Sequence, residues 1–172
     1  TEILGWVEEM NKVILSVQNV PVSTERVYFS PGEYCLNAIL NQIKGARNKI
    51  KICLFTISDD RIADTLIEKH KNGVDVKIIT DNDKIYDRGS DIKRLAEFNI
   101  PIKVDMTDNH MHHKFVVFDG ETLINGSFNW TRSATKYNQE DIVIQRNPII
   151  VEKFTERFEK LWKETKVLRI SY

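Results

Sequence analysis

The stretch from His112 to Asn129 constrains the fold of this chain more than any other. Two runs of apolar residues that favour β-strands, KFVVF and TLI, are separated by Asp119, Gly120 and Glu121. Asp-Gly between such runs is a strong signal for a β-hairpin with a two-residue loop. The sequence therefore predicts one antiparallel hairpin in this stretch.

The predicted register places a polar cluster at the open end of the hairpin. A two-residue loop sets His112 opposite Ser127 and Lys114 opposite Asn125, and opposite residues share a face. Because side chains alternate along a strand, one face is expected to carry His112, Lys114, Ser127 and Asn129. The other face is expected to carry Phe115, Val117 and Ile124.

These side chains have the chemistry of a phosphate site. Lys114 supplies a positive charge, Ser127 and Asn129 supply hydrogen-bond donors, and an imidazole such as His112 can attack phosphorus in line. A histidine nucleophile needs an acceptor that fixes its tautomer and supports its positive charge. Glu140, which begins the next apolar strand, is predicted to be that acceptor.

The spacing of these residues resembles the signature of the phospholipase D superfamily. That signature, H-x-K-x4-D-x6-G-S-x-N, is matched by His112, Lys114, Asp119 and the run from Gly126 to Asn129. The segments MHHKFVVFDG and NGSFNWT are similar to the single-motif bacterial endonucleases and to the Zucchini or mitochondrial cardiolipin hydrolase group. The resemblance begins at the strand that ends Phe-Ser-Pro and extends to the last helix.

The resemblance implies a phosphodiesterase that needs no metal or cofactor. Glu140 matches the carboxylate found eleven residues after the motif in the small endonuclease branch. One imidazole cannot both attack phosphorus and protonate the leaving oxygen on the opposite side. Single-motif members form twofold dimers, so the resemblance implies a homodimer with both His112 side chains at one phosphate. One His112 would form a phosphohistidine while the other protonates the leaving group.

Nucleic acid is the expected substrate, as DNA and/or RNA cut by an endonuclease. Arg132 and Lys136 are the expected backbone-binding cations, and His110 and Ser30 are further candidates for substrate contact. His110 is expected opposite Asn129, and Ser30 at a helix N-terminus, where backbone N–H groups can bind an anion. Further cations expected near the site are Lys84, Arg88, Lys49 and Lys51.

Other functions remain open at this stage. A lipid phosphodiesterase acting on cardiolipin would need an apolar entrance, and the polar segments NDKIYDRGSD and ATKYNQED supply little of one. A silent binding module is disfavoured, because binding alone does not require a nucleophile with its orienting carboxylate. The chain can also be the nuclease module of a larger targeted effector.

Some polar residues have simpler structural explanations. Asp119 lies in the turn and is interpreted as structural. His113 points away from His112 and is interpreted as an interior or subunit-contact residue. Gly126 is expected to permit close approach of a backbone or ligand. The loop at residues 81–83 lacks the glycine and distal glutamate of a calcium loop, so no metal site is predicted.

Composition indicates one soluble globular domain. The formal net charge of the 172 residues is zero, so any site for a polyanion must be a local patch. Two cysteines, Cys35 and Cys53, do not indicate a disulfide framework, and a cytoplasmic location is predicted. The alternatives are a periplasmic location or membrane association through a segment absent from this sequence. No transmembrane segment is predicted.

Strands and helices alternate along the chain with short connections. Residues 1–22 are predicted to form an amphipathic helix that packs on the core, followed by a linker. Residues 23–172 are predicted to form a phospholipase D-like catalytic domain, with a helix capping box from Ser30 to Glu33. The alternation predicts an α/β fold: a mixed, largely parallel sheet flanked by helices on both faces, in the α-β-α sandwich of the resembled superfamily.

Overall fold

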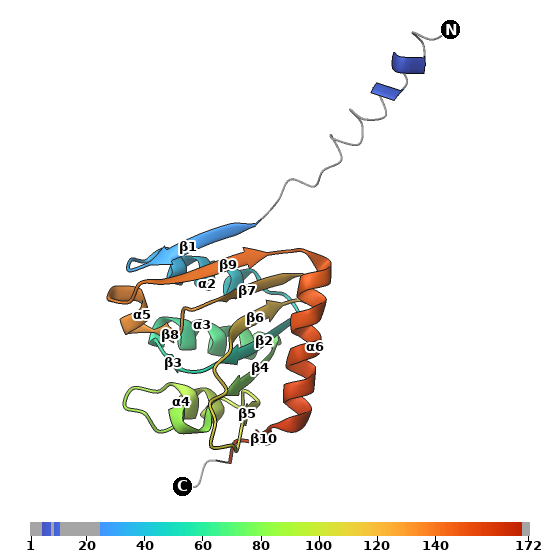
Figure 1. Ribbon diagram of the computed structural model, residues 1–172. Helices are drawn as coiled ribbons and strands as arrows, with labels where there is room; N and C mark the ends of the chain where they lie inside the picture. Colours follow the sequence, from blue (N-terminus) through green and yellow to red (C-terminus); the bar gives the residue numbers. More distant parts are fainter. Residues whose placement is uncertain (1–4, 8, 11–24, 170–172) are drawn as a thin grey trace.

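The computed structural model describes residues 5–7, 9–10 and 25–169. The strands in these residues are β1 (Arg26–Ser30), β2 (Lys49–Leu54), β3 (Ile57–Ser58), β4 (Asp75–Thr80), β5 (Ile102–Val104), β6 (Lys114–Phe118), β7 (Thr122–Gly126), β8 (Trp130–Thr131), β9 (Glu140–Gln145) and β10 (Lys166–Val167). The helices are α2 (Tyr34–Gly45), α3 (Asp60–Lys71), η1 (Asn82–Lys84), α4 (Ile92–Glu97), α5 (Arg132–Lys136) and α6 (Pro148–Glu164). Figure 1 shows how they are arranged.

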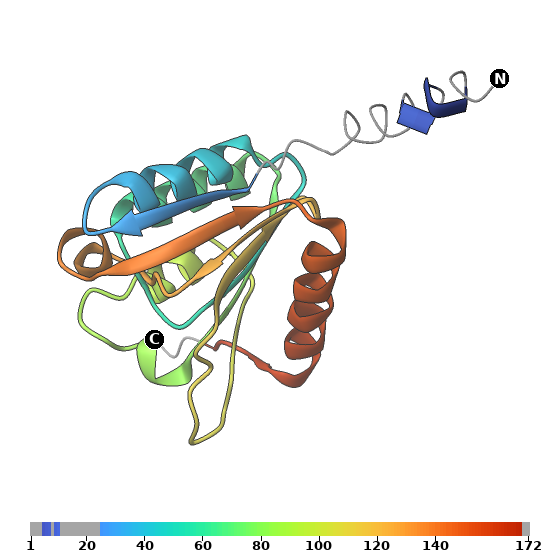
Figure 2. The ribbon, with the colours of Figure 1, turned by 45° about the horizontal axis from the view of Figure 1, so that its top comes forward.

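Helices cover both faces of the large sheet, which confirms the predicted sandwich. Helices α2 and α3 lie on one face and α6 lies across the other (Figure 2). Strand β6 shows the alternation that this requires, because Val116 and Phe118 enter the core under α2 and α3 while Phe115 and Val117 enter the core under α6. Each such buried side chain contributes about 1.5–3 kcal/mol to stability.

The sheet is mixed, as predicted, but it contains more antiparallel pairing than expected. Its strand order is β1-β9-β7-β6-β2-β4-β5-β10, and parallel pairing within it is confined to β2 with β4 and β4 with β5. The expectation of a largely parallel sheet assumed that each strand–helix–strand unit joins neighbouring strands. Helix α2 instead connects β1 to β2 across three intervening strands, β9, β7 and β6.

The predicted β6–β7 hairpin is present, but its register differs by one residue from the prediction. Phe118 pairs with Thr122, so the loop contains three residues, Asp119, Gly120 and Glu121. Asp119 and Gly120 both have positive φ angles, of 54° and 74°, and the Glu121 N–H donates to the Phe118 carbonyl at 2.9 Å. Glu121 is therefore an additional loop residue that a two-residue turn does not include.

The change of register moves the side chains of β7 to the opposite faces of the sheet. A shift of one residue has this effect because side chains alternate with a period of two. Ile124 pairs with Val116 and packs under α2 and α3, whereas Leu123 joins Phe115 and Val117 under α6. The prediction that Ile124 shares a face with Phe115 and Val117 is wrong for this reason.

The predicted capping box at Ser30 is also wrong. Helix α2 begins at Tyr34, and its N-cap residue Glu33 makes no side-chain capping hydrogen bond. Strand β1 continues to Ser30, which pairs with Glu140 of β9. The Ser30 hydroxyl donates to the Asn138 carbonyl at 2.8 Å and accepts from the Glu140 N–H at 3.2 Å. Ser30 therefore joins β1 to the start of β9.

The predicted N-terminal helix lies largely outside the described residues. Residues 5–7 and 9–10 are helical, and Trp6, Val7 and Met10 are exposed, so these side chains do not pack on the core as predicted. The predicted linker before residue 23 lies outside the described residues. In the described part of the chain, no helix has the length and apolar character needed to cross a membrane.

Candidate active site

The predicted catalytic residues gather at one edge of the large sheet. Strands β6, β7 and β9 are antiparallel neighbours, so the start of β6, the end of β7 and the start of β9 lie together. Lys114 begins β6 and His112 lies two residues before it, Ser127 follows β7, and Glu140 begins β9. Asn129 directly precedes β8. The fold thus brings residues separated by up to 28 positions to one surface (140 − 112 = 28).

His112 and Lys114 form the centre of this edge. The Lys114 Nζ atom lies 3.1 Å from His112 Nδ1 and donates to the His112 carbonyl at 2.9 Å. The His112 ring packs on Phe55, with 4.6 Å between ring centroids. Burial and the charges of Lys114 and His110 lower the pKa of His112, against an opposing effect of Asp81. The lowered pKa favours the neutral imidazole, which is the form that can attack phosphorus.

Lys114 carries its charge in a partly desolvated position. Burial lowers the pKa of Lys114, while the negative charge of Glu140 acts to raise it. No ion pair to Lys114 is found among the described residues. A cation without a contacting counterion at the sheet edge is suited to bind an anion.

Ser127 and Gly126 connect β7 to β9. The Ser127 hydroxyl donates to Asp141 Oδ1 at 3.2 Å and accepts from the Asp141 N–H at 3.1 Å. A Cβ atom at Gly126 would overlap the Asp141 carbonyl oxygen, so glycine is required for this close approach of two strands. The expected role of Gly126 is confirmed, whereas the Ser127 hydroxyl is already engaged by Asp141.

Asn129 and Glu140 differ in how far their polar groups are satisfied. The Oδ1 atom of Asn129 is buried without a hydrogen-bond partner among the described residues, so this end of the amide does not hold the fold together. Glu140 Oε1 accepts from Asn138 Nδ2 at 2.9 Å. Within the described part of the chain, no hydrogen bond joins Glu140 to His112, so the role of Glu140 as acceptor for His112 remains a prediction.

The predicted substrate-binding residues have different surroundings. Arg132 contacts Asp60 at 2.7 Å, while Lys136 is exposed at the end of α5. Ser30 is buried, and its hydroxyl is engaged by β9. His110 turns toward the loop after β4, where its Nδ1 atom lies 3.3 Å from Asp81 Oδ2.

Two of the additional cations lie away from the site. The Lys49 side chain lies beside Gly120, at the turn of the hairpin and therefore at the opposite end from His112. Lys51 forms an ion pair with Glu159 of α6. Their predicted place near the site is wrong because β2 runs antiparallel to β6, which sets the start of β2 beside the hairpin turn.

The sequence reasoning missed two residues that border the site, Phe55 and Asp81. Phe55 follows β2 and packs against both His110 and His112. Asp81 follows β4, is fully buried, and accepts the Met111 N–H at 2.9 Å. Both residues follow the carboxyl ends of adjacent parallel strands, a position where functional residues gather in α/β sheets. Their place directly after two predicted strands is the sequence signal that could have identified them.

His113 faces the other side of the sheet, as predicted. Its Nε2 atom accepts from Arg157 Nε at 3.4 Å, and its ring meets Phe115 edge to face. A cavity of about 520 Å³ lies beside it, between α6 and the loop before β6. Both His112 and His113 line this cavity, so it adjoins the candidate active site.

The imidazole, ammonium and amide groups at this edge are those that phosphoryl-transfer chemistry uses. A family model described as "Cardiolipin synthase, PLD-like domain" matches residues 39–162. The chain belongs to this phospholipase D-like family.

Individual relatives agree with this assignment. A mitochondrial cardiolipin hydrolase of Chlamydomonas reinhardtii is 42% identical over 127 residues, which cover 74% of this chain and 57% of that protein. One from Xenopus laevis is 35% identical over 155 residues, covering 84% and 74%. The crystal structure of Nuc, a phospholipase D family member from Salmonella typhimurium, matches with a TM-score of 0.79 and 28% identity, covering 86% of this chain and 99% of that one.

These relatives bear on two further points. The chain spans 57% of the length of the algal relative and 74% of the amphibian one. The prediction of a cytoplasmic location is contradicted, because the curated relatives are named as mitochondrial proteins. The cysteine content of the chain does not distinguish the cytoplasm from an organelle.

Proposed function

We propose that the protein is a metal-independent endonuclease that cleaves DNA and/or RNA through a phosphohistidine, in an active site shared by two copies of the chain. The observation that carries this proposal is the pairing of His112 with Lys114 at an open sheet edge. A neutral imidazole beside an ammonium group combines a nucleophile with a phosphate-binding charge.

The proposed reaction has two displacements at phosphorus. The imidazole of one His112 attacks phosphorus, the bond from phosphorus to the leaving oxygen breaks, and the protonated imidazole of the partner's His112 gives its proton to that oxygen. Water then attacks the phosphohistidine, the partner's His112 takes the proton from this water, and the P–N bond breaks. Lys114 and Asn129 would hold the non-bridging oxygens. This scheme requires a twofold dimer, because each chain contributes one such histidine.

The surroundings of the site support nucleic acid as the substrate. His112 is exposed at this edge, so a polymer can reach it without entering a closed pocket. Lys136 is exposed in α5, and Arg88 is exposed in the loop after β4. A few local cations of this kind contact phosphates without giving the chain a net positive charge.

A lipid phosphodiesterase is the second candidate function, and two observations favour it. Relatives that are 42% and 35% identical are named mitochondrial cardiolipin hydrolases. Phe29, Tyr34 and Tyr137 are 66%, 71% and 75% exposed and lie close in sequence to Ser30 and Glu140. Exposed aromatic side chains favour the boundary between water and lipid. We also infer a mitochondrial location for this chain from the names of its relatives.

The test is cleavage of labelled single-stranded DNA, duplex DNA, single-stranded RNA and cardiolipin vesicles in excess EDTA. We expect wild type to cut at least one nucleic acid and His112→Asn to cut at least about a thousandfold more slowly. His113→Asn is the matched control, because His113 faces the opposite side of the sheet, and it should retain the wild-type rate.

Each outcome of this test is decisive. Release of soluble headgroup from vesicles without cutting of nucleic acid would replace the nuclease proposal by the lipid one. Equal rates for His112→Asn and wild type would remove His112 as the nucleophile. Co-expression of wild type with His112→Asn tests the shared site, because a mixed dimer should be inactive whereas independent active sites would retain half of the activity.

A further inference from the structure

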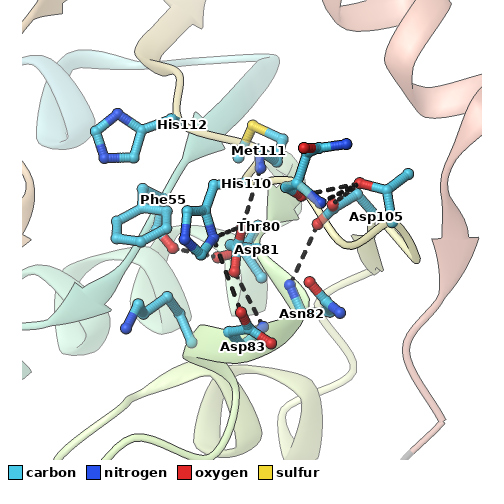
Figure 3. Close-up of polar contacts among 12 residues, drawn as sticks. Phe55, Thr80, Asp81, Asn82, Asp83, Asp105, His110, Met111 and His112 are labelled. Carbon is cyan, nitrogen blue, oxygen red and sulfur yellow. Dashed lines mark hydrogen bonds and ion pairs between the residues drawn. The ribbon is translucent and has the colours of Figure 1, made fainter.

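Two loops that are distant in the sequence meet beside the catalytic edge. The loop after β4 carries Asp81 and Asp83, and the loop before β6 carries His110 (Figure 3). His110 Nδ1 lies 3.3 Å from Asp81 Oδ2 and 3.8 Å from Asp83 Oδ2. One ligand atom from each of the three residues lies within 4.8 Å of the other two.

The carboxylate of Asp81 is held in place before any ligand binds. Asp81 is fully buried, and its two oxygens accept backbone N–H groups, from Asp83 at 3.0 Å and from Met111 at 2.9 Å. The Asn82 N–H donates to Asp105 Oδ1 at 3.2 Å, which ties the two loops together a second time. Ligands fixed in this way lose little conformational entropy when they bind an ion.

The negative charge at this place is not compensated by lysine or arginine contacts. Among the described residues, His110 is the sole ion-pair partner found for Asp81 and Asp83. Lys84 is near, but its Nζ atom contacts Asp87 at 2.9 Å. Backbone N–H groups compensate part of the cost of burying the Asp81 carboxylate, and a cation at this place would balance the remaining negative charge.

The two distances from His110 Nδ1 fit the ligand spacing of a tetrahedral metal ion. Ligands about 2.1 Å from a tetrahedral Zn²⁺ are separated from one another by about 3.4 Å. The distances of 3.3 and 3.8 Å from His110 Nδ1 lie on either side of this value. One imidazole and two carboxylates suit Zn²⁺, and three protein ligands leave a fourth position for water. The sequence reasoning missed this site because the third ligand comes from a different loop.

We propose that Asp81, Asp83 and His110 bind a Zn²⁺ ion that fastens the loop after β4 to the loop that carries His112. The ion takes no part in the phosphohistidine chemistry. Because its ligand His110 lies two residues before His112, the ion would hold in place the segment that carries the nucleophile. The proposal does not depend on the substrate, so it is tested by binding and stability rather than by turnover.

The first experiment uses Co²⁺ as a spectroscopic probe for Zn²⁺ in protein freed of metal with EDTA. We expect a saturable visible absorption of tetrahedral type at one Co²⁺ per chain, displaced by Zn²⁺. Asp83→Asn and His110→Asn should weaken binding at least about tenfold, since each removes one of three ligands. Asp87→Asn is the matched control, because it changes the same loop but contacts Lys84; its affinity should match wild type.

The second experiment measures thermal unfolding with and without Zn²⁺. Because the ion would bind the folded state alone, we expect the midpoint of wild type and of Asp87→Asn to rise by several degrees and that of Asp83→Asn to rise less. The Asp83 side chain is 63% exposed, so Asp83→Asn should fold. Absence of saturable binding by wild type up to millimolar metal, or equal binding by all variants, would overturn the proposal and leave His110 as a counterion of the two carboxylates.

Discussion

The two ends of the β6–β7 hairpin satisfy their polar groups in opposite ways. At the turn, the Asp119 carboxylate accepts backbone N–H groups from Arg47, Asn48 and Lys49 at 2.8–2.9 Å. At the open end, Lys114 carries a partly buried charge, and Asn129 Oδ1 is buried without a partner in the described residues. The charge of Lys114, which has no ion-pair partner among the described residues, is available to an anionic substrate.

This difference separates the residues that stabilise the fold from those that serve the reaction. Hydrogen bonds from backbone N–H groups to a carboxylate contribute to stability, whereas buried polar atoms without partners lower it. The signature of the family contains both kinds of residue, because Asp119 belongs to the turn and Lys114 to the site. Substitutions at the two ends should therefore move rate and stability in different directions.

Lys114→Met should produce the largest change. We expect the rate of phosphodiester cleavage to fall at least about a hundredfold, because the site loses the charge that binds the developing anion. The free energy of unfolding should rise by about 1 kcal/mol, because an apolar side chain replaces a partly desolvated cation. Cleavage rates and denaturant titrations measure the two effects. A fall in both quantities would show that Lys114 supports the fold and would remove the contrast between the two ends.

Asp119→Asn should have the converse effect. We expect the free energy of unfolding to fall by about 2 kcal/mol at pH 7, because an amide oxygen accepts more weakly than a carboxylate and the amide NH₂ faces N–H donors. The rate per folded molecule should not change. Denaturant titration and cleavage under stabilising conditions measure these quantities. A large loss of rate in fully folded protein would place Asp119 in the reaction.

The difference in stability between wild type and Asp119→Asn should depend on pH. Burial acts to raise the pKa of Asp119, but hydrogen bonds from the Lys49, Arg47 and Asn48 N–H groups outweigh burial and hold it below the ordinary value of 3.8. An acid whose pKa is lower in the folded state stabilises that state above its unfolded pKa. The advantage of wild type over Asp119→Asn should be complete above 3.8 and disappear as the pH falls through the lower folded value. An advantage that grows toward acid pH would contradict this assignment.

Glu140→Gln should produce the smallest change. We expect the cleavage rate to fall about tenfold, because Glu140 acts on Lys114 through its charge and contacts Asn138 rather than His112. Stability should remain within about 0.5 kcal/mol of wild type, since the side chain is partly exposed. An unchanged rate would remove Glu140 from the site. A loss as large as that of Lys114→Met would indicate direct participation in the reaction.

The sequence predicted the local features of the site and missed the features set by neighbouring strands. Asp-Gly between two apolar runs is a local signal, so the hairpin and the gathering of His112 with Lys114 followed from it. The register of the hairpin could not be predicted from this signal, because positive φ angles at Asp119 and Gly120 suit loops of two or three residues. The close approach of β9 at Gly126 and the packing of Ile124 fix the pairing, and neither can be inferred from the hairpin alone.

Long-range placement explains the remaining differences. The order of strands separates β1 from β2 by three strands, which the alternation of strand and helix does not reveal. Asp81 and His110 are 29 positions apart (110 − 81 = 29) and meet because β4 and β6 both flank β2. A short segment carries the signal for its own local structure, whereas these contacts depend on which strands become neighbours.

The bond between Ser30 and the start of β9 has a consequence for the order of folding. The Ser30 hydroxyl meets Asn138 and Glu140 across sequence separations of 108 and 110 residues. Contacts that close such long loops form late, and a chain that emerges from the ribosome gains them only after β9 has been synthesised. A nascent chain without β9 would therefore lack the sheet edge that holds Glu140, and with it the complete candidate site.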